Sequence, residues 1–215
     1  MFDRIAGVYD LMNGVMTAGM HQRWRERAVE LARVGSGSRA LDVATGTGDL
    51  ALALRDAGAE VVGCDFSEAM LTRARQKAPD IPFEWADALE LQYDDDSFDA
   101  ATVGFGARNF ADLGKGLAEM VRVVRPGGRV VVLEITTPQK PPLSTFFSLW
   151  FDRAVPTIGR LAGDPDAYAY LPSSVKRFPD PHALAGALAT AGLEEIRWVV
   201  TAGGIIAIHG GTVAR

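Results

Sequence analysis

The segment that most restricts the fold is a short apolar run that meets a glycine-rich turn and continues into a helical pattern. Residues 39–45 (RALDVAT) are a candidate strand, Gly46-Thr47-Gly48 form the turn, and residues 49–56 follow with helical character. Absent side chains at a glycine turn let backbone amides and the helix N-terminus approach a polar or anionic ligand group. The segment therefore predicts a strand–turn–helix unit with a ligand site at its turn.

The same unit recurs along the chain. A second strand is expected at residues 60–65, followed by a helix that Ser67 caps. Further strands are expected at residues 83–86, 97–105 and 129–135, and a helix at residues 113–124 that Pro126 and Gly127 stop. Strands that alternate with helices and read as continuous apolar runs are typical of a parallel sheet covered on both faces.

The alternation lapses between residues 138 and 180, which are rich in proline and aromatic residues and predict an inserted helical cap. A last helix is expected at residues 183–191, and residues 195–201 and 205–213 predict an antiparallel hairpin around Gly203-Gly204. We therefore predict an α/β fold with a doubly wound, mostly parallel seven-stranded sheet. Residues 1–215 form one domain in this prediction, with an N-terminal lid at about residues 1–30.

The composition fits one globular domain and excludes several classes of protein. The 215 residues are 48% hydrophobic and 23% charged, which suffices for a single core. The net charge of -5, with scattered Lys and Arg, provides no field for a polyanion, so nucleic acid is not an expected partner. The single cysteine, Cys64, excludes an internal disulfide and is predicted to be a buried strand residue.

Neither a metal site nor a membrane span is expected. The three histidines lack ligand spacing, and the first residues lack the apolar core of a signal peptide. No apolar run approaches the ~18 residues of a spanning helix. We expect a cytoplasmic protein that can contact the inner face of the membrane peripherally.

Three features favour S-adenosylmethionine over a dinucleotide as the ligand of the glycine turn. Asp42, four residues before Gly46, is placed to face the ammonium group of this cofactor, a position that a pyrophosphate would disfavour. Asp65, at the end of the second strand, can accept hydrogen bonds from a ribose diol, while Asp87 and the Ala88 amide can contact the adenine. The chain also lacks the second half of a dinucleotide fold. Each residue taken singly has an equally good structural explanation as a turn or a helix cap.

Beyond the glycine turn, the chain resembles the ubiquinone and menaquinone C-methyltransferase family. The resemblance begins at YDLMNGVMTAGMHQRW (residues 9–24) and continues, in the order of the family, through LDVATGTGDL, CDFSEAML, ADALEL, SFDAATVGFGARN, RVVRPGGRVVVLE, AYAYLPSSV, RFPD and AGGIIAIHGG. It implies transfer of a methyl group from S-adenosylmethionine to a ring carbon of a reduced, prenylated quinone precursor. The sequence departs from the family pattern at few positions. One of them is Gly104, where a serine is common, so only the backbone is left for one contact with the cofactor.

The resemblance and the placement of residues together give a set of candidate site residues. Arg108 follows the fourth strand, at the edge where open α/β sheets bind ligands, and is expected to stabilise the phenolate that forms on the ring. In the family it has been proposed to take the proton through a water, but arginine is effectively always protonated, so stabilisation is favoured. Asn109 is expected to orient the same hydroxyl. His21 and His209 are alternative bases, each with a structural explanation as well.

The remaining candidates bind the cofactor and the acceptor. The predicted cofactor-binding residues are Asp42, Gly46, Thr47, Gly48, Asp65, Phe66, Asp87, Ala88 and Gly104. The predicted acceptor-binding residues are Tyr9, Arg108, Phe147, Trp150, Tyr168 and Tyr170. The aromatic residues of the cap can line a groove for a prenyl tail, pack the cap onto the sheet, or form the face of a homodimer.

Two other functions remain open at this stage. A methyltransferase for a small soluble phenol or acid would share the cofactor site, but it would not need the long aromatic cap. A cofactor-binding scaffold without turnover would keep the glycine turn but would have lost the chemistry at Arg108.

Overall fold

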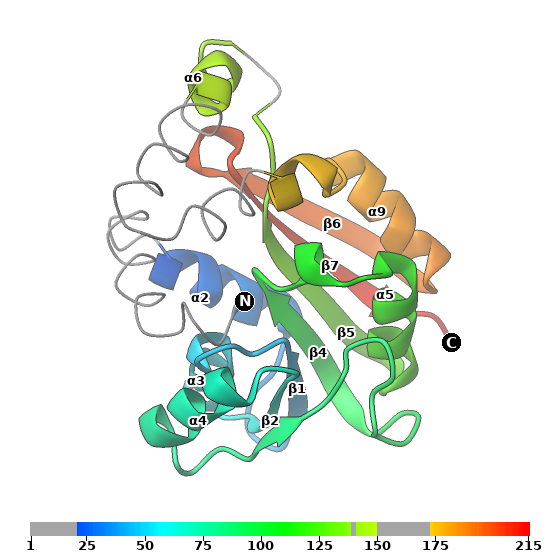
Figure 1. Ribbon diagram of the computed structural model, residues 1–215. Coiled ribbons are helices and arrows are strands. Elements are labelled where there is room, and N and C mark those ends of the chain that lie inside the picture. The colour runs from blue at the N-terminus through cyan, green and yellow to red at the C-terminus, as the bar shows by residue number, and fades with distance from the viewer. Residues whose placement is uncertain (1–20, 139–140, 150–172) are drawn as a thin grey trace.

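A computed structural model describes residues 21–138, 141–149 and 173–215 of the chain. Within these residues one mixed sheet has the strand order β3-β2-β1-β4-β5-β7-β6 (Figure 1). Its strands are β1 (Arg39–Val43), β2 (Glu60–Asp65), β3 (Phe83–Trp85), β4 (Phe98–Gly104), β5 (Val124–Ile135), β6 (Leu193–Thr201) and β7 (Ile206–Val213). The pairings from β3 to β5 are parallel, whereas β7 runs antiparallel to both β5 and β6. The predicted fold class, with its antiparallel C-terminal hairpin, is confirmed.

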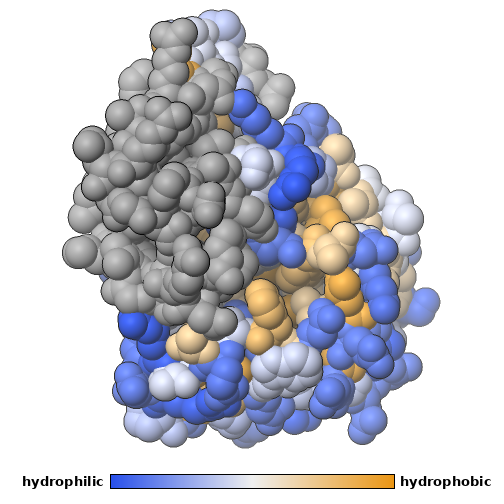
Figure 2. Space-filling model, in the orientation of Figure 1, coloured by the Kyte–Doolittle hydropathy of each residue, from blue (hydrophilic) through white to orange (hydrophobic). Residues whose placement is uncertain are grey.

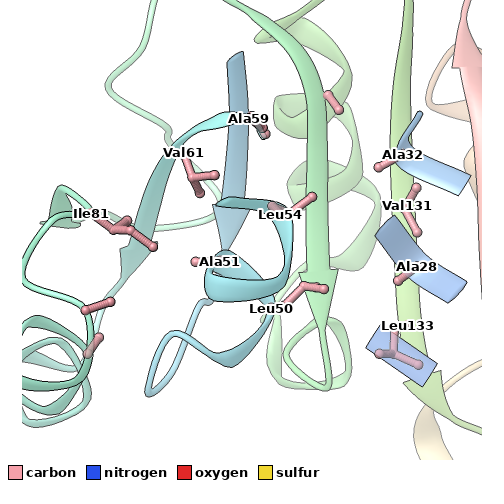
Figure 3. Packing of buried hydrophobic residues seen from close by; sticks show 14 of the residues in the cluster. Ala28, Ala32, Leu50, Ala51, Leu54, Ala59, Val61, Ile81, Val131 and Leu133 are labelled. Atoms are coloured by element: carbon pink, nitrogen blue, oxygen red, sulfur yellow. The ribbon is translucent and has the colours of Figure 1, made fainter. Parts of the chain in front are cut away.

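Helices cover both faces of the sheet, as the apolar runs of its strands require. Helices α2 (His21–Ala32), α3 (Asp49–Asp56) and α4 (Glu68–Lys77) pack on one face. Helices α5 (Leu113–Arg122) and α9 (Pro181–Thr190) pack on the other. Figure 3 shows Ala28 and Ala32 of α2 lying against Val131 and Leu133 of β5. Small alanines let this helix approach the central strands closely, and burial of apolar side chains on both faces stabilises the layers.

The helices begin where the sequence supplies acceptors for their first amides. Ser67 accepts a hydrogen bond from the Met70 amide and begins α4, and Asp112 accepts from the Lys115 amide and begins α5. Asp180 accepts from the amides of His182 and Ala183 at α9, whose first residue is Pro181. Such caps satisfy amides that the helix itself leaves unbonded. The expected cap at Ser67 is confirmed.

The predicted end of the helix before Pro126 is wrong. Helix α5 ends at Arg122, and strand β5 already begins at Val124, which pairs with Phe98 of β4. The register then shifts, so that Ala100 pairs with Arg129 and the Pro-Gly-Gly segment bulges out of the pairing. A proline is tolerated in a strand at such a bulge, because no ladder hydrogen bond is needed there.

The described parts of the predicted lid and cap are packed elements. Residues 21–30 belong to α2, whose Trp24 and Ala28 are buried in the core. In the cap, α6 (Leu143–Leu149) places Phe147 in a small apolar cluster with Val175. Cys64 is buried on β2, as predicted, and this burial raises the pKa of its thiol.

Candidate functional site

A cavity of about 370 Å³ opens at the carboxyl ends of β1, β2, β3 and β4. This is the edge at which open α/β sheets bind ligands, and the volume lies in the range of small-molecule sites. The described lining residues come chiefly from α2, the glycine turn and the start of α3, the ends of the four strands, and the segment around the end of η1 (Ala107–Asn109). They include every residue of the predicted cofactor set except Gly48, the last residue of the turn.

The glycine turn is held in a conformation that other residues rarely adopt. Gly46 and Gly48 have φ angles of 56° and 84°, in the left-handed region that favours glycine. At Gly48 an added Cβ would lie 2.8 Å from Cζ of Phe83, so a side chain is also excluded by space. Gly48 caps α3 without a side-chain hydrogen bond, which leaves the start of this helix to other partners.

Asp42 is a buried carboxylate in the wall of this cavity. Its oxygens accept hydrogen bonds from the hydroxyls of Thr45 at 2.6 Å and Thr102 at 2.7 Å. Burial raises the pKa of Asp42 from 3.8 to about 6, although both hydroxyls act to lower it. A cationic group of a ligand would offset this desolvation, because it favours the ionised form.

Asp65 braces the glycine turn from the neighbouring strand. One oxygen accepts a hydrogen bond from the Gly46 amide and the other from the Ser67 amide, each at 2.9 Å. Each carboxylate oxygen can accept more than one hydrogen bond. The role predicted for Asp65 toward a ribose diol therefore remains a prediction, with a positioning role added by the structure.

The far end of the cavity carries two exposed aromatic side chains. Phe66 and Trp85 are 56% and 53% exposed, and the Trp85 indole donates to the Phe66 carbonyl oxygen at 2.9 Å. Asp87 and Ala88 follow directly, and the Asp87 carboxylate accepts from the Leu89 amide. Trp85 was missed in the sequence, although it stands at a strand end two residues before Asp87.

Two of the non-glycine residues with left-handed backbone border the cavity. Ala44 and Phe105, which follow β1 and β4, have φ angles of 51° and 59°, a costly conformation for residues with a Cβ. Between them, an added Cβ on Gly106 would lie only 2.6 Å from the Cβ of Ala44. At Gly104 an added Cβ would lie 3.1 Å from Leu50, so Leu50 would have to shift to admit a serine. The two loops are thus fitted closely against each other.

Arg108 is buried in an ion pair that the sequence did not predict. Its guanidinium donates to Glu134 at 2.7 Å and to the Phe105 carbonyl oxygen at 2.5 Å, while its backbone amide donates to the same carboxylate at 3.2 Å. The side chains are only 7% and 1% exposed. Asn109 lines the cavity, whereas Arg108 is not among its described lining residues. The predicted role of Arg108 in catalysis stays a prediction, and Glu134 already compensates its charge.

The other candidates lie elsewhere or outside the described residues. His21 begins α2 and does not line the described part of the cavity. His209 is fully buried, bonded to the Pro181 carbonyl oxygen and stacked on Trp198, which matches its structural explanation. Phe147 packs on Val175, which agrees with the alternative that the aromatic residues of the cap serve packing. Tyr9, Trp150, Tyr168 and Tyr170 lie outside the described residues.

The described residues contain neither a candidate membrane span nor a candidate metal site. None of their helices is both long and apolar enough to cross a membrane. In the same part of the chain, no three His, Cys, Asp or Glu side chains gather as metal ligands would.

The strand order places the polar residues of the cavity in sequence along one edge. Asp42 lies in β1, Asp65 ends β2 and Asp87 comes two residues after β3, and these three strands are neighbours in the sheet. A ligand with a cation, a diol and a flat amino-bearing ring would meet them in this order, and S-adenosylmethionine has these three parts. The fold and the site thus fit the class of S-adenosylmethionine-dependent methyltransferases.

Sequence comparison gives the family within this class. The profile of the ubiE/COQ5 methyltransferase family matches residues 1–213, and the chain belongs to this family. Demethylmenaquinone methyltransferase of Thermus thermophilus is 48% identical, over 98% of this chain and 99% of that protein. The enzyme of the same name from Deinococcus radiodurans is 48% identical over 89% of this chain and 83% of its own length.

Solved structures share the fold at low sequence identity. A SAM-dependent methyltransferase from Thermotoga maritima, described as a possible histamine N-methyltransferase, superposes with a TM-score of 0.70 at 18% identity, covering 98% of this chain and 97% of its own. Phosphoethanolamine N-methyltransferase 2 of Haemonchus contortus, solved with S-adenosyl-L-methionine, gives a TM-score of 0.65 at 14% identity, covering 89% of this chain and 52% of its own.

The family, rather than the fold, gives the activity. The chain is an enzyme of methyl transfer in quinone biosynthesis, as the other members of its family are.

Proposed function

We propose that this chain methylates a ring carbon of a prenylated quinol, converting demethylmenaquinol to menaquinol with S-adenosylmethionine bound in the described cavity. The observation that carries the proposal is the row of Asp42, Asp65 and Asp87 along the strand ends of a chain that the family profile matches over residues 1–213. The proposed acceptor is taken from the names of the relatives, and the described cavity is the proposed binding site of the cofactor.

Each cofactor contact follows from the chemistry of the lining residues. Asp42 faces the ammonium group, and Asp65 accepts from the ribose hydroxyls while it holds the glycine turn. The adenine lies near Phe66 and Trp85, whose exposed faces offer stacking, with Asp87 and the Ala88 amide at its edge. Among the described lining residues are four carboxylates, which disfavour the pyrophosphate of a dinucleotide.

The acceptor approaches from the side of β4 and η1. Bound S-adenosylmethionine supplies a methyl group on a cationic sulfur, so the protein needs chiefly to align the two reactants and exclude water. Asn109 orients the ring hydroxyl from the cavity wall, and the buried Arg108 stabilises the negative charge that develops on it. Since a phenol with a pKa of ~10 is mostly protonated at neutral pH, this stabilisation sets how readily the ring carbon reacts.

Hydrophobic side chains gather near the middle of the described surface on the face shown in Figure 2, within a mostly hydrophilic surround. A prenylated acceptor finds apolar surface there, which supports a lipid-like acceptor rather than a small soluble phenol. Peripheral contact with a membrane is part of this proposal, because such an acceptor resides in one.

The test is methyl transfer from labelled S-adenosylmethionine to demethylmenaquinol, with two matched arms. The oxidised quinone, which has no ring hydroxyl, is expected to be inert, and a small phenol without a prenyl tail is expected to react far more slowly. Calorimetry with S-adenosylmethionine and with NAD tests the cofactor separately. Failure to methylate any prenylated quinol would refute the proposed acceptor, and binding of NAD alone would refute the proposed cofactor.

A further inference from the structure

The charged residues that line the cavity are unequally distributed. Asp42, Asp49, Asp65 and Asp87 contribute carboxylates, and Arg25 is the single cation among the described lining residues. An anionic group of any ligand in this cavity therefore has one favourable side chain to approach. S-adenosylmethionine carries one such group, the carboxylate of its amino acid part.

Arg25 extends from α2 toward the start of α3. Its side chain is 15% exposed, and Nη2 donates to Oδ2 of Asp49 at 2.5 Å. No other hydrogen bond joins this guanidinium to the described residues, although it has five N–H donors. Several donors therefore remain for a ligand that enters the cavity.

The partner of Arg25 does not cancel its charge, because Asp49 also pairs with Lys77 of α4 through its other oxygen. The single negative charge of Asp49 is thus shared between two cations. Asp49 is the first residue of α3, whose N-terminal end adds a positive partial charge. Arg25 and the N-terminal end of α3 thus lie at one corner of the cavity, whereas the Asp42 carboxylate lies in its wall.

We infer that Arg25 binds the α-carboxylate of S-adenosylmethionine, while Asp42 faces its ammonium group. The inference rests on the proposed function and names a residue outside the predicted cofactor set. The two charges of the amino acid then fix the direction in which the cofactor lies along the strand ends. A structural alternative is that Arg25 only ties α2 to α3 through Asp49.

The experiment compares S-adenosylmethionine with decarboxylated S-adenosylmethionine, which keeps the ammonium but lacks the carboxylate, by calorimetry. Arg25→Gln is expected to weaken S-adenosylmethionine about ten- to a hundredfold, which is about 1.4–2.8 kcal/mol. The same variant is expected to bind the decarboxylated compound within about twofold of the unmodified chain. Arg23→Gln, which changes an exposed arginine of the same helix, is the matched control and is expected to leave both affinities unchanged.

Asp49→Asn separates the two roles of Arg25. It breaks the charge pairing with α3 but leaves the guanidinium, so S-adenosylmethionine is expected to bind as tightly as before or more tightly. The inference is overturned if Arg25→Gln weakens both compounds equally, or if Asp49→Asn reproduces the loss. Failure of the unmodified chain to bind S-adenosylmethionine at all would instead overturn the proposed function, and this inference with it.

Discussion

Substituting Asp42 by asparagine should make the ligand-free protein more stable while it weakens cofactor binding. Burial raises the pKa of this carboxyl from 3.8 to about 6 in the folded chain. Protonation therefore favours the native state, and this contribution is fully present below pH 3.8 and lost as the pH rises through about 6. Above that pH, the folded protein carries a buried charge that an amide of the same shape avoids.

The size of the effect follows from the two pKa values. Relative to a group that never ionises, the raised pKa of Asp42 lowers the free energy of unfolding by about 3 kcal/mol at pH 7.5 and by about 1.6 kcal/mol at pH 5, at 1.36 kcal/mol per pKa unit. Asp42→Asn should therefore raise the free energy of unfolding by up to about 3 kcal/mol at pH 7.5 and by about half as much at pH 5. Affinity for S-adenosylmethionine should fall about ten- to a hundredfold, because an ionic hydrogen bond to the ammonium is lost.

Urea unfolding of the ligand-free protein at several pH values measures this difference. Thr102→Val is a suitable control, since it keeps the volume but removes a hydroxyl that bonds Asp42, and it should destabilise at neutral pH. If Asp42→Asn lowers stability by the same amount at pH 5 and pH 7.5, the carboxyl does not titrate near pH 6 and the reasoning fails.

Three further predictions concern the packing and charges around the cavity. Gly106→Ala should lower the free energy of unfolding by about 1–3 kcal/mol, because its Cβ would meet Ala44. Gly186→Ala, in the open middle of α9, should raise it by about 0.5–1 kcal/mol. Equal unfolding midpoints for the two variants would contradict this. Glu134→Gln should lower the free energy of unfolding by about 3–5 kcal/mol, since it leaves the Arg108 cation buried without its carboxylate. Adding Arg108→Met should restore most of that stability but not the turnover. A loss under 1 kcal/mol in denaturant unfolding of Glu134→Gln would count against the buried pair. Asp65→Asn should weaken S-adenosylmethionine about tenfold or more in calorimetry, because an amide cannot accept from both Gly46 and Ser67; unchanged affinity would rule out its bracing role.

The parallel core of the fold could be predicted from local patterns. Each strand, turn and helix from Arg39 to Asp65 is encoded by neighbouring residues, so glycines, caps and apolar runs suffice to place it. The end of α5 could not be placed in this way. It depends on the pairing of Val124 with Phe98, a contact between segments that are distant in sequence.

In the candidate site, too, local patterns predict some residues but not the contacts between segments that are distant in sequence. The sequence placed Asp42 and Asp65 at strand ends, but the hydroxyl that bonds Asp42 comes from Thr102, its register partner on β4. Glu134 lies in an apolar strand pattern, and nothing local indicates that it meets Arg108. Such pairs are set by the register of the sheet, which a single sequence does not specify.

The strained loops at Ala44 and Phe105 also bear on the speed of binding. Left-handed backbone at residues with a Cβ costs about 1–3 kcal/mol each, and the folded protein already meets that cost before a ligand arrives. These two loops then need no further ordering during association. The rate at which a ligand enters should accordingly depend on diffusion and access, and differences in affinity among variants of these loops should appear mainly in the dissociation rate.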